Sequence, residues 1–518
     1  MKKLDIFYTL FLIVLSGYFR FTNLAQNPGI YNDEGTLLNI SNNLHKGSLE
    51  YLGIQGSWLL AGRMPVFPWL LSSSYNFFEP SLLVLRGFTA LSSIISVVLL
   101  FWFLKSLSDK NLLFIKYLSP LVLALHPKFV LFNRIGFGYN LLIPITILIT
   151  WFFWSYLQSK NKHWIFFASI FVGIGVLIEL AYIAFVVFLA ILILLFDPRK
   201  LFFVIVISLT PLFLYFLISL FLFGSPFLFD WQTTFERGTS HSLFLQIATM
   251  LVTTIVSFTF ADTSLLIGLL GSLAIPNRKL AIIGFFGIIV PTLVINRTFS
   301  TINQSFYYFL PYLPFVAIGI SSVIHKMIEW ILKFSNELCD AYVFQVLRKN
   351  QSVKWRTFIF SLILIITILG PAVLLVLDLD TQARHKFRTS FDHLLIDISE
   401  FSKIIDFVNT VTKPMDTIIA SPAIAWAIQA NTTDYQISIA VNEQPTIHFP
   451  NGIPKERMRF QTDIENARYV IIDSITRSWE DEQIPGIYEW IQQIETQWIP
   501  VFKTTSLVVY QNPQLLTK

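Results

Sequence analysis

The sequence predicts an α-helical polytopic membrane protein with a small α/β domain at its C-terminal end. Of the 518 residues, 54% are hydrophobic and only 13% are charged, whereas soluble domains carry roughly 25% charged residues. A chain this apolar cannot cover itself against water as one soluble core, so lipid must be part of its solvent. After Leu377 the pattern changes, and short strand-like runs alternate with helical ones, which is typical of an α/β domain.

Charge and cysteine content exclude several classes of function. The net charge is +5, and no basic run is interleaved with aromatic residues, so nucleic acid is not an expected partner. The single cysteine, Cys339, excludes a structural disulfide and a cysteine metal cluster. The apolar N-terminal segment lacks a small-x-small cleavage site, so we expect a retained transmembrane helix rather than a signal peptide.

Eleven segments have the length and composition of membrane spans, because about 30 Å of hydrocarbon requires roughly 20 apolar helical residues. They are residues 4–22, 80–104, 112–131, 138–157, 163–178, 180–196, 200–222, 258–276, 280–296, 304–325 and 357–377. The stretch 243–276 is too long for one span and too short for two, so a single crossing and a re-entrant segment both stay open.

The distribution of Lys and Arg predicts the orientation. With the N-terminus in the cytoplasm, the inner loops hold about twice as many Lys and Arg residues as the outer ones, as the positive-inside rule requires. We therefore expect residues 1–378 to form the transmembrane domain of a plasma (cell inner) membrane protein. Residues 379–518 are then an extracytoplasmic α/β domain, and residues 23–79 form the first outer loop.

Polar motifs gather in that outer loop. It contains Asn-Pro-Gly-Ile-Tyr-Asn-Asp-Glu-Gly at 27–35 and Gly-Arg-Met-Pro-Val-Phe-Pro-Trp at 62–69, and residues 306–314 read Phe-Tyr-Tyr-Phe-Leu-Pro-Tyr-Leu-Pro. Together with Arg20 at the end of the first span, these motifs resemble the protein O-mannosyltransferase and aminoarabinose transferase (ArnT-like) superfamily. That resemblance implies the GT-C membrane fold, and the C-terminal domain resembles the outer domain that many bacterial members append.

The resemblance implies an inverting glycosyltransferase that moves a sugar from a polyprenyl-phosphate donor to a lipid, protein or glycan acceptor on the extracytoplasmic face. Phosphate departs readily, so this reaction needs no general acid, unlike glycoside hydrolysis with its two carboxylates. One carboxylate must accept the proton of the acceptor. Cationic side chains must hold the phosphate and stabilise its growing charge.

Asp33 fits the catalytic base. Glu34 is assigned to the catalytic site together with Asp33. Three roles for it stay open: it binds a divalent cation (Mg or Mn), it orients Asp33, or it only caps a helix. The residues expected to bind the donor phosphate are Arg63, Arg297, Tyr307, Lys128 and Arg134.

Each of these residues also has a purely structural interpretation. Asn32 suits the N-cap of the next helix, and Asp33 and Glu34 suit its first turn, where acids are favourable to the helix dipole. Arg63 and Arg297 suit interfacial anchors, and tyrosines such as Tyr308 suit the aromatic belt.

The sequence departs from the family pattern at two places. Tyr139-Asn140 stands where relatives often have an acid near the start of the fourth span, and Gly62 stands where some have an acid before the basic residue. Both departures shift the chemistry to Asp33. Glu179, the one acid between Gly173 and Leu195, is expected at an outer turn as a loop residue.

Two rival functions stay open. A transporter or flippase of lipid-linked glycans would show paired repeats and polar residues at the bilayer midplane, whereas the polar residues here gather in outer loops. A catalytically inactive membrane scaffold would bind the donor without transferring its sugar.

Overall fold

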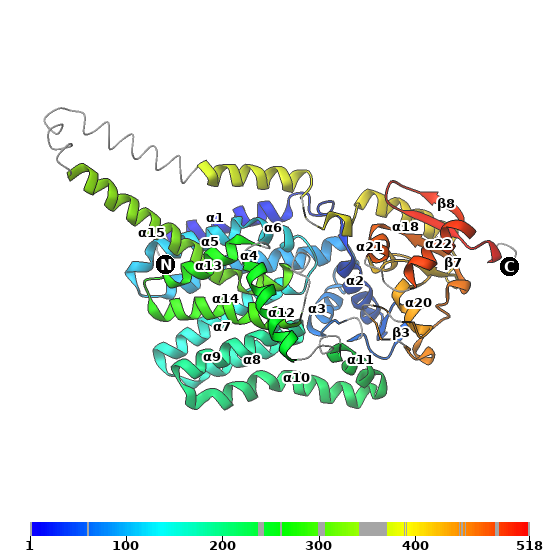
Figure 1. Ribbon diagram of the computed structural model, residues 1–518, viewed down its shortest axis with the longest axis horizontal. Coiled ribbons are helices and arrows are strands. Elements are labelled where there is room, and N and C mark those ends of the chain that lie inside the picture. Colours follow the sequence, from blue (N-terminus) through cyan, green and yellow to red (C-terminus); the bar gives the residue numbers. More distant parts are fainter. Residues whose placement is uncertain are drawn as a thin grey trace.

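A computed structural model of the chain places a bundle of helices beside a smaller α/β unit (Figure 1). Between the two lie the helices of the loop 23–79, α2 (Asn32–His45) and α3 (Val66–Ser74). The structure describes residues 3–59, 62–236, 243–258, 262–298, 306–340, 370–387, 389, 391–444, 446, 449–450, 452–481 and 486–515.

Within the described residues, six helices are long and apolar enough to cross a membrane, the fourth and sixth together with the 3₁₀ turn before them. They are α1 (Lys3–Phe21), α4 (Leu82–Ser106), α7 (Tyr139–Ser159), α10 (Leu201–Phe223), α14 (Arg278–Thr298) and α15 (Leu313–Asp340). The pair α5 (Leu113–Leu125) and α6 (Pro127–Asn133) is bent by 56° and makes a seventh if it crosses as one span. The chain is an integral membrane protein, as predicted.

Three shorter apolar helices pack into the bundle. They are α8 (Lys162–Ile178), α9 (Ile183–Phe196) and α13 (Thr263–Leu273). Ten of the eleven predicted spans overlap a bundle helix, and the eleventh lies mostly outside the described residues, where only its end belongs to a helix over 370–384. The stretch 243–276 contains two helices, because α12 (Leu243–Val256) precedes α13.

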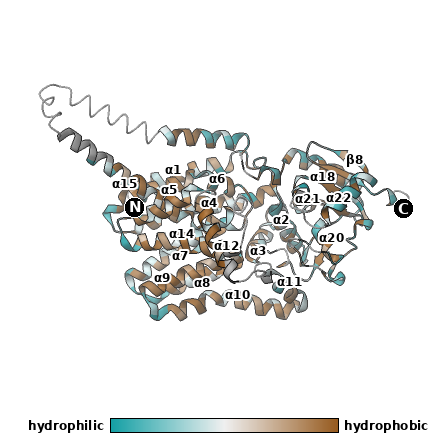
Figure 2. Cartoon of the chain, in the orientation of Figure 1, coloured by the Kyte–Doolittle hydropathy of each residue, from teal (hydrophilic) through white to brown (hydrophobic). Residues whose placement is uncertain are grey.

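Hydrophobic residues concentrate on the bundle and hydrophilic ones on the C-terminal unit (Figure 2). Helix α10 shows the effect most clearly, since Phe202 and Phe221 are 81% and 89% exposed. Exposed apolar surface of this extent is what a lipid-facing helix requires.

The C-terminal unit contains a five-stranded sheet in the order β6-β5-β7-β9-β8. Strands β5 (Thr417–Ile419), β6 (Asn431–Thr433) and β7 (Ala467–Ile472) run parallel, and β8 (Ile499–Lys503) and β9 (Val508–Gln511) complete the sheet antiparallel. Its helices include α18 (Ile398–Val411), α19 (Pro422–Ala425), α20 (Tyr435–Val441), α21 (Ser474–Asp481) and α22 (Ile487–Gln497). The predicted α/β class is confirmed, and the boundary at 378 stays a prediction.

The C-terminal unit is docked on the loop 23–79 through backbone contacts. Strand β1 (Ile30–Tyr31) pairs antiparallel with β4 (Leu395–Ile396). A Cβ atom on Gly35 would lie 1.9 Å from the carbonyl oxygen of Pro422, so only glycine permits this approach. Residues of the loop also complete the core of the C-terminal unit, among them Ile30, Ile40, Tyr51, Leu52, Ile54 and Trp58. The loop is therefore part of both halves of the molecule.

Candidate active site at one end of the bundle

The first turn of α2 and the segment before α3 bring together a carboxylate and a guanidinium. A carboxylate oxygen of Asp33 lies 2.6 Å from Nη2 of Arg63, and the two side chains remain 22% and 13% exposed. Gly62, beside the arginine, has a φ of +72°, a backbone conformation that favours glycine over an acidic residue. The pair is partly open to a ligand and carries both functions that the predicted chemistry requires.

Glu179 joins this pair from the turn between α8 and the 3₁₀ turn Leu180–Tyr182. It is only 4% exposed, and a Cβ atom on Gly138 would lie 2.4 Å from its Oε1. Burial raises the pKa of Glu179 to about 7; the charge of Arg63 lowers it and that of Asp33 raises it. Its carboxylate thus reaches the start of α7, where the sequence itself offers only Tyr139-Asn140.

Arg63 stays charged between these acids. Burial lowers its pKa, but the carboxylates of Asp33 and Glu179 act in the opposite direction and raise it above its ordinary value. Two acids and one guanidinium therefore share the site. A phosphate that displaces one carboxylate from Arg63 would find a cation with bidentate donors.

Tyrosines form one wall of the site. They come from the 3₁₀ segment Phe306–Tyr312. Tyr307 stacks on Phe137 with the ring centroids 4.6 Å apart, and Tyr308 meets Tyr139 edge-on at 5.0 Å. Both lie within electrostatic reach of Asp33. The wall faces the protein interior rather than only the membrane interface.

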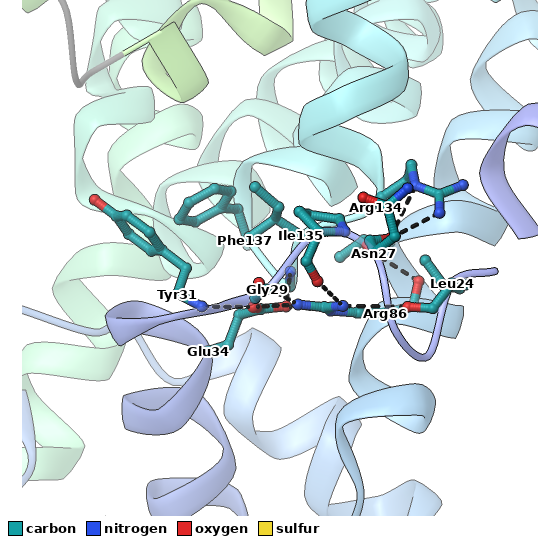
Figure 3. A network of polar contacts seen from close by, with 12 residues as sticks. Leu24, Asn27, Gly29, Tyr31, Glu34, Arg86, Arg134, Ile135 and Phe137 are labelled. Carbon is teal, nitrogen blue, oxygen red and sulfur yellow. Dashed lines mark hydrogen bonds and ion pairs between the residues drawn. The ribbon is translucent and has the colours of Figure 1, made fainter. Parts of the chain in front are cut away.

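Glu34, next to Asp33, lies in a buried network (Figure 3). Nε and Nη2 of Arg86 donate to its two oxygens at 2.8 Å each, and the backbone N–H groups of Gly136 and Tyr31 donate at 2.8 and 3.0 Å. Both side chains are fully buried. The Tyr31 contact caps the helix, as the sequence suggested for Glu34, but the N-cap residue is Tyr31 and not the predicted Asn32, which begins the helix.

Arg134 is occupied in the same network (Figure 3). It is fully buried, and its guanidinium donates to the carbonyl oxygens of Phe19, Thr22 and Asn27, each at 2.7 Å. These bonds tie the end of the first span to the loop 23–79. This geometry favours a positioning role for Arg134. Its contact with the donor phosphate stays a prediction, and the occupied guanidinium speaks against it.

The remaining predicted cations lie on other elements. The ammonium of Lys128, at the start of α6, lies 4.5 Å above the ring of Phe306 and 3.4 Å from the carboxylate of Asp262. Arg297 belongs to α14, and its side chain lies outside the described residues. Of the predicted site residues, the structure therefore brings together Asp33, Arg63 and Tyr307.

The predicted divalent cation does not fit the acids assigned to it. Among the described residues, no group of three or more His, Cys, Asp or Glu side chains is placed to hold a metal ion. Four donors fill the carboxylate of Glu34, and Asp33 faces a guanidinium. The two acids therefore do not form a metal site.

Sequence reasoning missed Glu179 as a member of the site. It lies at the expected turn, but its carboxylate is buried against Arg63 rather than exposed in a loop. The available signal was its isolation in an apolar run, since an ionisable residue there is a functional candidate by default.

Comparisons with known proteins confirm the fold. Residues 62–223 match the family model for dolichyl-phosphate-mannose-protein mannosyltransferase. ArnT from Cupriavidus metallidurans bound to undecaprenyl phosphate has a TM-score of 0.59 at 12% identity, covering 98% of this chain and 97% of that one. Archaeoglobus fulgidus oligosaccharyltransferase AglB, in complex with an inhibitory peptide and a dolichol-phosphate, has a TM-score of 0.54 at 13% identity, covering 99% and 74%.

A search of curated proteins found no match. The predicted resemblance is confirmed by the family model and the solved structures, and the chain has the GT-C fold.

Proposed function

We propose that this protein is an inverting glycosyltransferase that moves a sugar from a polyprenyl-phosphate donor to an acceptor at the extracytoplasmic face of the membrane. The observation on which the proposal depends is the Asp33–Arg63 pair, 2.6 Å apart and partly open at the end of an apolar bundle. Similar folds whose solved structures contain undecaprenyl phosphate or a dolichol-phosphate support a lipid-linked donor.

The proposed step is a single displacement. The acceptor oxygen or nitrogen attacks the anomeric carbon as Asp33 takes its proton, and the bond from that carbon to the phosphate oxygen breaks. The products are the glycosylated acceptor, the polyprenyl phosphate and protonated Asp33. Attack opposite the leaving group inverts the anomeric configuration.

Arg63 serves both ends of this step. In the structure its guanidinium neutralises Asp33. With the donor in place, the same fork stabilises the charge that grows on the departing phosphate, and Asp33 is released to act as a base. Tyr307 belongs to the motif at residues 306–314 and lines one side of the site.

Glu179 tunes the charge of the site. With a pKa of about 7, it is largely protonated in mildly acidic solution and then adds no negative charge beside the donor phosphate. Its carboxylate lies at the end of α7 where relatives often have an acid and this chain has Tyr139-Asn140.

The proposed orientation places the N-terminus in the cytoplasm and the site with the C-terminal unit on the opposite side of the plasma membrane. The excess of Lys and Arg in the inner loops supports this arrangement. The acceptor is a lipid, a protein or a glycan.

Transfer of a labelled sugar from a polyprenyl-phosphate donor by purified protein tests the proposal. Asp33→Asn removes the base and should reduce transfer by about 10²- to 10⁴-fold while the protein stays folded. Asp406→Asn changes an exposed acid on α18 and should leave transfer unchanged.

Full activity of the Asp33→Asn variant would exclude the proposed base. Wild-type protein that binds the donor but transfers nothing to any acceptor would favour the inactive scaffold.

A further inference from the structure

A polar cleft of about 700 Å³ lies where α2 meets the C-terminal unit. One side is formed by the second half of α2 and the residues that follow it, and the other by the chain from Ala425 at the end of α19 to Thr432 in β6. Each half of the molecule contributes one wall, so the cleft exists only when the two are docked.

Three amides line the cleft from α2. Asn39, Asn42 and Asn43 are spaced i, i+3 and i+4, so they lie on one face of the helix. The Oδ1 atom of Asn39 accepts from the N–H of Leu52 and from Nδ2 of Asn43. Within the described part of the chain, Nδ2 of Asn39 and the side-chain amide of Asn42 make no hydrogen bond, although Asn39 is only 9% exposed.

The opposite wall contains an aromatic side chain. Trp426 lines the cleft and stacks on Phe401 with an interplanar angle of 13°, which fixes the indole ring. Its Nε1 is buried, and no acceptor for it lies among the described residues. Donors and acceptors of an amide row opposite an indole match the hydroxyl groups and the apolar C–H faces of sugar rings.

The charges of the cleft balance. Its charged lining residues are two cations, Lys46 and Arg459, and two anions, Glu50 and Glu79. Arg459 lies 3.2 Å from the carboxylate of Glu50, so part of this charge is already neutralised. A site for a phosphorylated or otherwise anionic ligand would instead carry an excess of cations.

The cleft opens on the side of α2 turned away from the reaction site. Asn42 follows Asp33 by nine residues, which is about half a turn round the helix at 3.6 residues per turn. Gly35, which touches Pro422, lies on the same side as Asn42. A ligand in the cleft is therefore held at a distance from Asp33, beyond the Gly35–Pro422 contact.

We propose that this cleft binds a neutral glycan chain and so anchors a carbohydrate acceptor on the enzyme. The inference rests on the proposed function and narrows its acceptor to the carbohydrate class. A peptide acceptor is the competing occupant, because the edge strand β6 borders the cleft through Thr432, and an open strand edge binds extended peptides.

Equilibrium binding to the full-length protein in nanodiscs tests the proposal. The probes are linear tetrasaccharides of mannose, glucose and N-acetylglucosamine, a Ser/Thr-rich dodecapeptide and a phosphorylated disaccharide. We expect saturable binding of at least one tetrasaccharide. Asn42→Ala should weaken it by about three- to tenfold, the loss of one or two hydrogen bonds, and Asn42→Trp should abolish it by filling the cleft.

Two controls separate this inference from the proposed function. Asn466→Ala alters an exposed asparagine of the C-terminal unit away from the cleft and should bind the tetrasaccharide as wild type does. Asp33→Asn should also retain full binding while losing transfer.

The proposal is overturned if no tetrasaccharide binds, or if Asn42→Trp binds it as wild type does. It is also overturned if the dodecapeptide or the phosphorylated disaccharide is the probe that Asn42→Trp excludes. Sugar transfer by wild-type protein without tetrasaccharide binding would remove the anchor and leave the proposed function intact.

Discussion

Asp33 and Glu34 are neighbours in the chain and occupy opposite kinds of environment. Glu34 is fully buried, and four donors satisfy its two oxygens. Asp33 faces one guanidinium and stays partly exposed. The same contrast separates Arg86, whose donors are filled by Glu34 and backbone carbonyls, from Arg63.

The difference identifies which acid is available for chemistry. A carboxylate whose lone pairs are all engaged cannot take a proton from a substrate without breaking a buried network. A carboxylate held by one exchangeable partner can. The network around Glu34 therefore positions α2, and the pair at Asp33 is the part that a donor and an acceptor reach.

The largest effect is expected for Glu34→Gln, which tests the contrast between Glu34 and Asp33. The substitution leaves the charge of Arg86 buried opposite a neutral amide, and removing one partner of a buried pair typically costs 3–5 kcal/mol. We expect a large drop in the unfolding temperature and a low yield of folded protein. Thermal unfolding in detergent, with Asp33→Asn as the matched control, measures the effect.

Asp33→Asn should melt near the wild-type temperature, because its environment is partly exposed. An Asp33→Asn variant that melts as low as Glu34→Gln would show that both acids are structural.

The next effect is expected at Gly35, where the C-terminal unit touches α2. The methyl group of Gly35→Ala would overlap the carbonyl of Pro422, so the backbone must shift and Asp33 must move with it. A displacement of about 1 Å at a reacting group can lower the rate by roughly 10²-fold. We expect kcat to fall at least tenfold with a smaller change in the donor KM.

Gly87→Ala on α4 is the matched control, because its added Cβ would have open space around it. Equal loss of activity in both variants would contradict a specific role for the Gly35 contact.

A smaller effect concerns the charge of the open site. Above pH 7, Glu179 ionises and adds a negative charge beside the donor phosphate, so the donor KM should rise severalfold between pH 6 and 8. Glu179→Gln should flatten this dependence. The groups that interact with Glu179 are Arg63, Asp33, Tyr139 and Tyr308. A donor KM that depends on pH equally in both proteins would exclude Glu179 as its source.

The smallest expected effect concerns Asp434, a buried acid of the C-terminal unit. Burial raises the pKa of Asp434 to about 7, and its side chain accepts from the N–H of Gln436 at 3.1 Å. Because the folded pKa exceeds the unfolded one, the contribution to stability is full below about pH 4 and is lost as the pH rises to about 7.

Asp434→Asn keeps a helix-capping side chain and removes the ionisation. We expect it to raise the unfolding temperature of the C-terminal unit by a few degrees at pH 8, and by less at pH 4. An equal increase at both pH values would show that ionisation is not the cause.

The sequence predicted the features that depend on local composition. Helices such as α10 are apolar on all sides, so length and hydropathy suffice to place them. The order of the motifs at 27–35, 62–69 and 306–314 led to the GT-C fold, which the solved structures confirm. The roles of Asp33, Arg63 and Tyr307 stay predictions, although the structure places the three residues together.

Contacts between distant positions were beyond the sequence. Glu34 and Asp33 look alike until Arg86, 52 positions further on, closes on Glu34 alone. From the sequence alone, Arg134 resembles a phosphate ligand. In the structure its guanidinium instead donates to the carbonyl oxygen of Phe19. Glu179 becomes part of the site only because Gly138 leaves room for its carboxylate. Each assignment depends on a tertiary neighbour that no local pattern specifies.

The pairing of β1 with β4 has a consequence for the order in which this protein matures. The segment that presents Asp33 emerges near the beginning of synthesis, yet Asn27 is held by backbone groups of Gln382, Ala383 and Phe387, and Ile30 pairs with Ile396. A newly made chain must therefore deliver its last quarter to the same side of the membrane before the loop can settle. Until then the nascent protein is latent, and a truncated product would be inserted in the membrane but inert.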